Sequence, residues 1–184
     1  MKRIAKAGMA VGILFGSALV AYAITSLLFT QSQTSSFQKK TIFRFNLSTG
    51  LTSGEIGPGD SFSTSPTIDN DATEDMYVFI KVEMPTVDSG EKLYAFDVAD
   101  SWLEVEDGVY AYATETEMTI LTPGEKTTPL TTEMTMKSIT NAEYAGIDDI
   151  NITITGYAIG TEGVASSPQE AWTICKELGE LAGM

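Results

Sequence analysis

The sequence predicts an all-β protein, a jelly-roll-like antiparallel β-sandwich with a short C-terminal helix, preceded by an N-terminal signal or anchor helix. Three observations predict it. Strand-like stretches rich in Val, Ile, Tyr and Phe are separated by turn residues roughly every 8–12 positions, a single helical pattern stands near the C-terminus, and an uncharged apolar stretch follows a basic N-terminus. A parallel α/β fold is excluded because the crossover helices that it needs are missing.

Residues 1–23 have the pattern of a secretory signal peptide. Three basic residues come first: Lys2, Arg3 and Lys6. An uncharged stretch follows over residues 7–30, and Ala21-Tyr22-Ala23 fits the small-x-small pattern of signal peptidase, which places the mature start at Ile24. The uncharged stretch is also long enough to cross a hydrocarbon core of ~30 Å, so a retained anchor that reaches about residue 30 stays open as the alternative.

The mature N-terminus would begin with an apolar, β-compatible segment that should not be left bare in water. Two ways of covering it stay open: it forms an edge strand of its own domain, or it is a donor strand that adds to the sheet edge of a neighbouring subunit. The donor residues would be Ile24, Thr25, Ser26, Leu27, Leu28, Phe29 and Thr30. Residues 31–40 are polar and look like a linker, so the expected division is 24–40 for donor and linker and 41–184 for the β-sandwich domain.

Alternation of apolar and polar residues, with turns between, marks the strands of the domain. The clearest is 76–84, which is expected to be a central strand, and 102–106 and 109–114 are expected to form a hairpin around Asp107-Gly108. The other expected strands are 41–47, an edge-type strand at 61–68 that contains Pro66, 132–139 and 150–159.

A single helix is expected over 168–181. Ser167 stands at the N-cap position, Pro168 at the first helical position and Glu170 two residues later. An amphipathic stripe follows, and it is expected to dock on the sandwich. Its members are Ala171, Trp172, Cys175, Leu178 and Leu181.

Charge and composition restrict the partners and the chemistry. The formal net charge of −14 becomes −17 once the signal segment is removed, which disfavours nucleic acid and anionic lipid. The chain has no histidine, which excludes His-dependent acyl transfer and zinc sites with imidazole ligands. The one cysteine, Cys175, has no partner for an intramolecular disulfide and is expected to be a small buried apolar residue.

Carboxylates are the remaining candidates for chemistry. A glycosidase would need two of them in one cleft, and the candidates are Glu104, Glu106, Glu115 and Glu117, although nothing in the sequence singles out a pair. The loop at residues 69–75 is dense in acidic residues that suit calcium, but it lacks the glycine and the final glutamate of an EF-hand, so a solvated loop is the expected state. We therefore expect no enzyme activity, no cofactor and no metal.

The order of motifs resembles the TasA and camelysin family. The residues that carry the likeness are Ala21-Tyr-Ala, Pro58-Gly-Asp, Pro66-Thr-Ile-Asp-Asn, Tyr77-Val-Phe-Ile-Lys-Val-Glu, Trp102, Gly108-Val-Tyr-Ala-Tyr, Leu121-Thr-Pro-Gly-Glu, Leu130, Ile152-Thr-Ile-Thr-Gly-Tyr-Ala-Ile and Glu170-Ala-Trp. The resemblance implies a jelly-roll domain secreted by Gram-positive bacteria, processed by a dedicated signal peptidase and polymerised into biofilm-matrix fibres, with residues 24–30 as donor strand. The apolar stretch after Ala23 departs from the polar, acidic one usual in the family.

Three functions follow in order of preference. The first is a secreted structural subunit at the cell surface or in the extracellular matrix, whose partner is itself and other matrix proteins and which touches a membrane only through its N-terminal segment before cleavage. The second is a monomeric, membrane-tethered surface module that binds a glycan or a protein. The third is a carboxylate glycosidase, which would require one acidic side chain with a raised pKa.

Overall fold

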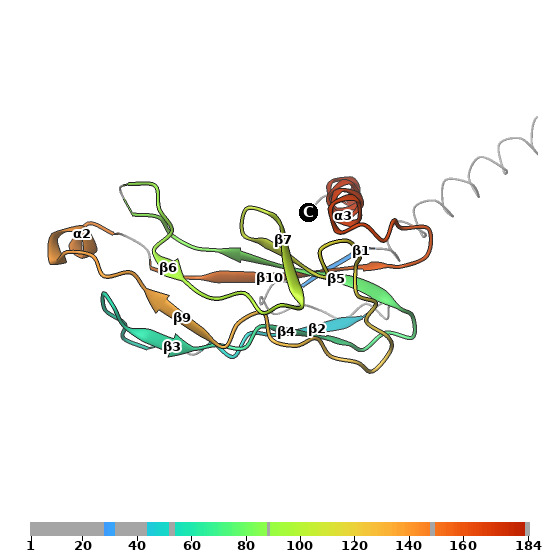
Figure 1. Ribbon diagram of the computed structural model, residues 1–184, viewed down its shortest axis with the longest axis horizontal. Coiled ribbons are helices and arrows are strands. Elements are labelled where there is room, and N and C mark those ends of the chain that lie inside the picture. The colour runs from blue at the N-terminus through green and yellow to red at the C-terminus, as the bar shows by residue number, and fades with distance from the viewer. Residues whose placement is uncertain (1–27, 32–43, 52–53, 88, 148–149, 183–184) are drawn as a thin grey trace, which may run out of the picture.

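The computed structural model describes residues 28–31, 44–51, 54–87, 89–147 and 150–182. Antiparallel strands form two layers, with one helix lying across the upper layer near the C-terminus (Figure 1). The expected mostly-β fold with a C-terminal helix is therefore confirmed. The predicted signal or anchor helix lies outside the described residues.

The upper layer is a five-stranded antiparallel sheet in which β5 is central, as predicted. β5 pairs with β10 on one side and with β8 on the other, and β1 and β7 are the outer strands. In spatial order the strands are β1 (Leu28–Gln31), β10 (Thr153–Gly160), β5 (Met76–Glu83), β8 (Val109–Tyr112) and β7 (Trp102–Glu106).

The lower layer contains two smaller sheets. One pairs β2 (Phe45–Ser48) with β4 (Thr67–Asn70), and the other has β9 (Glu133–Met136) between β3 (Ser61–Ser63) and β6 (Tyr94–Ala95). The prediction of one continuous strand over 61–68 was wrong, because Thr64 to Pro66 separates β3 from β4. Pro66 has no N–H to give to a ladder, but the segment stays in the layer because Thr64 N–H donates to Thr132 O and Leu130 N–H donates to Pro66 O.

The alternation of β5 divides its side chains between two clusters, as predicted. Met76, Val78, Ile80 and Val82 are buried between the layers, where they pack with side chains of the lower layer such as Phe45. On the opposite face, Tyr77 and Phe79 pack in a second cluster with residues of the C-terminal helix. A strand that is buried on both faces explains why β5 is apolar at almost every position.

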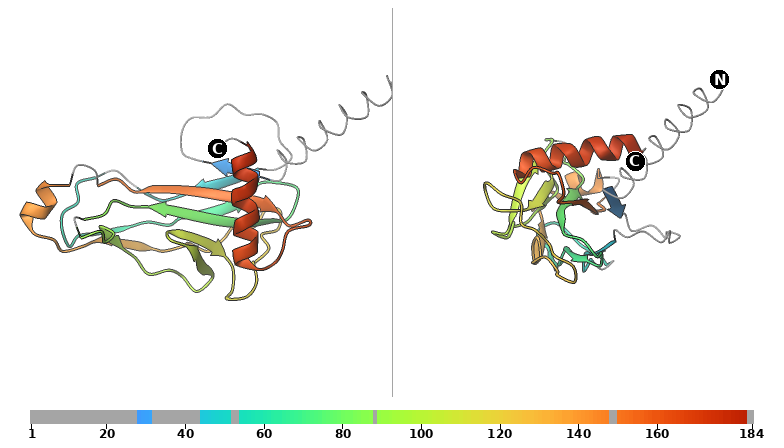
Figure 2. Two further views of the ribbon diagram at one scale, coloured as in Figure 1. Left: turned by 90° about the horizontal axis from the view of Figure 1, so that it is seen from above. Right: turned by 90° about the vertical axis from the view of Figure 1, so that its right-hand side faces the viewer.

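Helix α3 (Pro168–Ala182) lies across that second face near one end of the sheet, as Figure 2 shows from above and from the side. Ala171, Trp172 and Cys175 are buried on the sheet, with the Trp172 ring 5.2 Å from the Phe79 ring. The Cys175 side chain is 1% exposed, and its burial raises the pKa of the thiol to about 12. Both the position of the helix and its docking on the sheet were correctly predicted.

A second, five-residue helix, α2 (Asn141–Ala145), was not predicted. It begins with a capping box in which the Glu143 N–H donates to the Thr140 hydroxyl and the Glu143 carboxylate accepts from Thr140 N–H. Its hydrogen bonds lower the pKa of the Glu143 carboxyl. No helix among the described residues is both long and apolar enough to cross a membrane.

The hairpin of β7 and β8 is formed as expected, but its turn differs in one detail. Gly108 adopts a φ of 72°, whereas Asp107 keeps a negative φ, and a β-bulge lies between Glu104 and Glu106. A Cβ atom at Gly108 would lie 2.7 Å from Val82 O, so glycine is required there both by its φ and by the close approach of β5.

Candidate assembly edge

β1 lies at the outer edge of the upper sheet and pairs with the C-terminal half of β10. Leu28 is opposite Ile159, and Gln31 is opposite Gly156. Three of the predicted donor residues, Leu28, Phe29 and Thr30, therefore belong to a strand that adds to a sheet edge in its own chain. The remaining donor residues and the predicted cleavage site lie outside the described residues: Ala21, Ala23, Ile24, Thr25, Ser26 and Leu27. Gln31, expected in the linker, is the last residue of β1.

The N-terminal half of β10 is an open edge within the part of the chain that the structure describes. β1 reaches only to Gly156, and no described strand pairs with 153–155 on that side. Val82 donates its N–H to Gly108 O toward β8, so its neighbours Lys81 and Glu83 direct their backbone groups toward β10. By the same alternation, the N–H and C=O of Ile154 point away from β5, toward the open edge, where a further strand could accept and donate hydrogen bonds.

Side chains of β2 and β4 pack closely beneath the junction of β1 and β10. A Cβ atom at Gly156 would lie 3.0 Å from Phe45 Cε2, and within 3.5 Å of Leu47 and Ile68. Gln31 is opposite Gly156, and Phe45 follows it in the sequence after the 13 residues from 32 to 44. The two residues that flank this segment, Gln31 and Phe45, therefore both meet the same glycine.

Replacing Gly156 with valine is expected to lower the free energy of unfolding by about 1–3 kcal/mol, because the added methyl groups would force the two layers apart. Thermal unfolding followed by circular dichroism measures the change. Gly54→Val is the matched control, since a Cβ atom at Gly54 meets no described residue within 4 Å. Equal unfolding temperatures for the two variants would contradict this role of Gly156.

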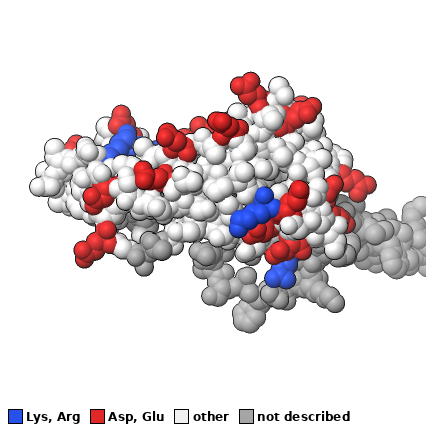
Figure 3. All heavy atoms as spheres, turned by 60° about the horizontal axis from the view of Figure 1, so that its bottom comes forward, with Lys and Arg blue, Asp and Glu red and all other residues white. Residues whose placement is uncertain are grey.

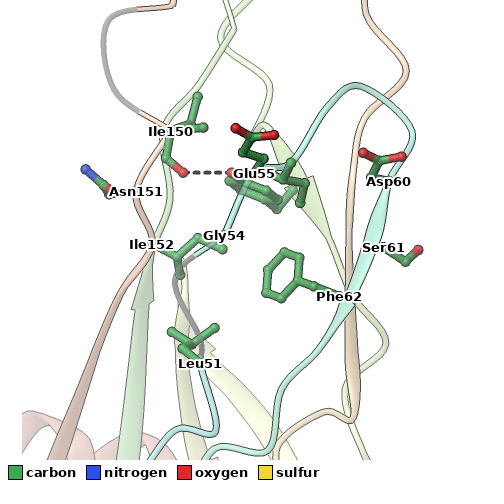
Figure 4. A pocket seen from close by; sticks show the side chains of 11 residues that line it. Leu51, Gly54, Glu55, Asp60, Ser61, Phe62, Ile150, Asn151 and Ile152 are labelled. Carbon is green, nitrogen blue, oxygen red and sulfur yellow. Dashed lines mark hydrogen bonds between the residues drawn. The ribbon is translucent and has the colours of Figure 1, made fainter.

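A groove lies between the layers next to the open edge. It has a volume of about 560 Å³ and runs between the segment before β10 and the segment that leads into β3. Figure 4 shows the side chains of Phe62, Ile152 and Leu51 turned toward one another on its floor. The Tyr94 hydroxyl donates to Ile150 O (2.7 Å), and the Tyr94 ring lies edge-on to the Phe62 ring at 5.9 Å.

Two carboxylates stand at the rim of this groove, Glu55 and Asp60, both exposed (Figure 4). The Asp60 carboxylate accepts from Gly57 N–H (2.9 Å) and so orders the turn, whereas no described lysine or arginine lies within ion-pair distance of either residue. The groove thus combines an apolar floor, an acidic rim and an unpaired strand edge. Ile150, Ile152 and Ile154 were predicted to share a face, and all three pack inward.

The opposite edge of the upper sheet, at β7, is protected by contacts with α3. Gln169 of α3 donates to Val105 O (2.7 Å), and Trp172 Nε1–H donates to the Glu106 carboxylate (2.8 Å), which also pairs with Lys176. The bulge and these charges are the usual means by which an edge strand is kept from pairing with another chain. The two edges of one sheet therefore differ in their capacity to accept a strand.

The ion pair that protects β7 has a consequence for stability against pH. Hydrogen bonds from Lys176 and Trp172 lower the pKa of the Glu106 carboxyl below its ordinary value. The pair therefore stabilises the folded state above the pKa of Glu106 in the unfolded chain, about 4.3, and this contribution is lost as the pH falls through the lower folded-state pKa.

Lys176→Met is expected to lower the unfolding temperature slightly at pH 7, and the gap from the unchanged protein should close below about pH 4. Because both side chains are nearly half exposed, the pair contributes less than about 1 kcal/mol. Unfolding temperatures measured from pH 7 to pH 2.5 test this, with Lys92→Met, which removes the pair to the largely exposed Asp107, as control. A gap that widens in acid would contradict it.

The predicted carboxylate candidates are not gathered in one cleft. Glu104 accepts from Gly108 N–H (3.0 Å), and burial, together with the charge of Glu104, raises the pKa of Tyr110 to about 12. Glu106 faces Lys176 on α3, and its lowered pKa is the reverse of what a general acid requires. Glu115 and Glu117 are exposed in the loop after β8, next to the isolated pairing of Ala113 with Met118.

The acidic loop at residues 69–75 is organised by an amide. The Asn70 side chain is fully buried and donates to Glu74 O (2.9 Å) and Leu121 O (2.8 Å), while its oxygen accepts from Ala72 N–H (2.9 Å). Among the described residues there is no group of three or more acidic or thiol side chains that could hold a metal ion. Sequence reasoning missed Asn70, although an Asx turn at the start of an acidic loop is a recognisable signal.

Sequence reasoning also missed the groove, because its floor comes from segments about 90 residues apart. Comparison of the chain with protein-family models, with curated proteins and with solved structures finds no match. A function for the chain must therefore come from its own residues and from the geometry of this edge.

Proposed function

We propose that the chain is a secreted, non-enzymatic structural subunit of extracellular surface or biofilm-matrix fibres, which assembles by exchange of its N-terminal strand between copies. The proposed domain is a β-sandwich of jelly-roll type. The observation that carries the proposal is the position of β1: it pairs with the edge of β10, and the residues that flank segment 32–44, Gln31 and Phe45, both meet Gly156.

Strand exchange requires little new structure in this arrangement. The residues that pair with β10 in one copy would make the same backbone hydrogen bonds when they come from a neighbour, so the exchange replaces one strand by an identical one. The 13 residues from 32 to 44 can span up to ~43 Å when extended, which is enough to link two domains. Within the upper sheet, the protection of β7 favours the β1 and β10 edge as the place for addition. The resemblance to TasA and camelysin proteins supports the same function.

A cysteine pair across β1 and β10 tests the proposal. Thr30 and Tyr157 are directly opposite, and by the alternation of the ladder they form a non-hydrogen-bonded pair, in which the Cα atoms approach most closely. In Thr30→Cys/Tyr157→Cys, oxidation of the monomer should lock the strand in its own chain and prevent filaments, and reduction should restore them. Electron microscopy and non-reducing gels give the readout.

Oxidation after assembly should instead give a ladder of disulfide-linked oligomers, because the strand then belongs to the neighbour. Thr30→Cys alone is the control, since Cys175 is buried and should not react in the folded protein. Deletion of residues 24–30 should abolish the filaments. Filaments from the locked monomer, or only intrachain disulfides in assembled material, would overturn the proposal.

The groove favours a second candidate, a surface module that binds a glycan or a peptide. Its volume of about 560 Å³ and its aromatic floor of Phe62 and Tyr94 lie within the range of ligand pockets. This function requires a persistent monomer in which Phe62→Ala abolishes ligand binding. Glycan-array binding by the monomer, with no filaments under any condition, would favour it over the fibre subunit.

A further inference from the structure

The charges of the chain differ sharply between residues 24–44, here called the arm, and the domain that follows them. Residues 24–44 carry three cations, Lys39, Lys40 and Arg44, and no acidic residue, whereas all 25 acidic residues and only five lysines follow residue 44. Figure 3 shows how far acidic side chains outnumber basic ones on one face of the domain.

Each of the five lysines of the domain is paired with a carboxylate of the same domain. Each lies within 4 Å of a carboxylate: Lys81 with Glu83, Lys92 with Asp107, Lys126 with Asp69, Lys137 with Glu91 and Lys176 with Glu106. The cations of the arm are thus the natural complement of the acidic surface of another copy.

The register of β1 directs the arm toward the groove. β1 runs antiparallel to β10 with Gln31 opposite Gly156, so each further residue that continues the strand would lie opposite one residue earlier in β10. Residue 37 would reach Ile150, and Lys39 and Lys40 would come just beyond it. Ile150 lines the groove whose rim carries Glu55 and Asp60 (Figure 4).

In its own chain the arm is restricted because it must return to Phe45, whose ring lies against Gly156. Phe45 comes five residues after Lys40, and five residues reach at most ~17 Å. The six residues from Gly156 back to Ile150 span about 20 Å where they are extended. A second copy has no such restriction, because its own Phe45 lies in a different domain.

We infer that the open edge of β10 and the adjoining groove are the seat of residues 32–40 of a second copy, with Lys39 and Lys40 placed against Glu55 and Asp60. The inference rests on the proposed strand exchange and adds to it a recognition step. The backbone of the arm pairs with the edge around Ile154, and the lysines select the acidic end of the groove. Charge complementarity thus fixes the register in which copies join.

A charge exchange tests the inference, with the critical concentration for filament assembly measured by sedimentation. Lys39→Glu/Lys40→Glu should raise this concentration by roughly tenfold or more, because charges of like sign would then meet at the rim. Adding Glu55→Lys/Asp60→Asn should restore it to within about threefold of the unchanged protein. Asparagine at position 60 keeps the side-chain oxygen that accepts from Gly57 N–H.

The matched control combines the same arm variant with Glu115→Lys/Glu117→Gln, which makes an equal change in net charge in the exposed loop after β8. This control should give no rescue. Equal rescue by both pairs, or an arm variant that assembles normally, would overturn the inference while leaving strand exchange intact. Failure of the unchanged protein to assemble, together with failure of the disulfide test, would overturn both.

Discussion

Replacing Trp172 with alanine is expected to lower the free energy of unfolding by about 3–5 kcal/mol, a large part of the ~5–15 kcal/mol that holds a domain of this size together. The indole is 5% exposed, lies 5.2 Å from the Phe79 ring and 5.4 Å from the Tyr157 ring, and donates to Glu106. Removing it opens a cavity between α3 and the central strands of the sheet. Chemical denaturation followed by circular dichroism gives the value.

Trp172→Phe separates packing from hydrogen bonding. It keeps a ring between Phe79 and Tyr157 but loses the donor to Glu106, so a loss of about 1 kcal/mol is expected. The alanine variant should also loosen α3 from β7 and thereby remove the contacts that protect this edge in the native protein, so its solutions should aggregate at lower concentration. Alanine and phenylalanine variants of equal stability would contradict the role assigned to the ring.

Replacing Asn70 with alanine is expected to cost about 2–4 kcal/mol of unfolding free energy. The side chain is fully buried. Its removal deletes the hydrogen bonds that it makes with Glu74 O and Ala72 N–H, and one of the hydrogen bonds to Leu121 O. Each buried polar group left unsatisfied costs about 1–3 kcal/mol, offset in part where water enters the loop. Urea denaturation measures the effect.

Asn46→Ala is the matched control for this variant, because Asn46 is an exposed residue of β2 and its replacement should change stability by less than about 0.5 kcal/mol. Asn70→Asp is expected to be at least as destabilising as Asn70→Ala at neutral pH. Aspartate keeps the acceptor for Ala72 N–H, but it places a charge against two carbonyl oxygens. An Asn70→Ala variant as stable as Asn46→Ala would contradict this account of the loop.

The parts of the fold that could be predicted from sequence are those in which local and tertiary preferences agree. Met76, Val78, Ile80 and Val82 alternate without interruption, and the structure buries all four between the layers. The C-terminal helix has a proline at its first position and an apolar stripe, and it begins at Pro168 as expected. In both elements one pattern determines the structure and the buried face.

The structural features that sequence analysis did not predict correctly depend on contacts with residues far away in the sequence. Helix α2 has only five residues and no apolar stripe, so its capping box at Thr140 and Glu143 was the one available signal. The break between β3 and β4 depends on the segment that faces it, in which only Thr132 and Leu130 form hydrogen bonds with Thr64 and Pro66. The apolar segment that is proposed as the donor could be recognised from its composition, but the edge of β10 that is open among the described residues depends on how far β1 extends, which no local pattern shows.

The difference between the two edges of the upper sheet sets the valence of the subunit in the proposed assembly. A unit with one strand to give and one edge that accepts has two linking points, so its polymers are linear and polar, with chemically distinct ends. Branch points would need a second acceptor edge, and the contacts of Gln169 and Lys176 with β7 disfavour one there. A three-dimensional matrix made from such chains would therefore depend on lateral association, and its stiffness would be set by bundling and not by the density of junctions.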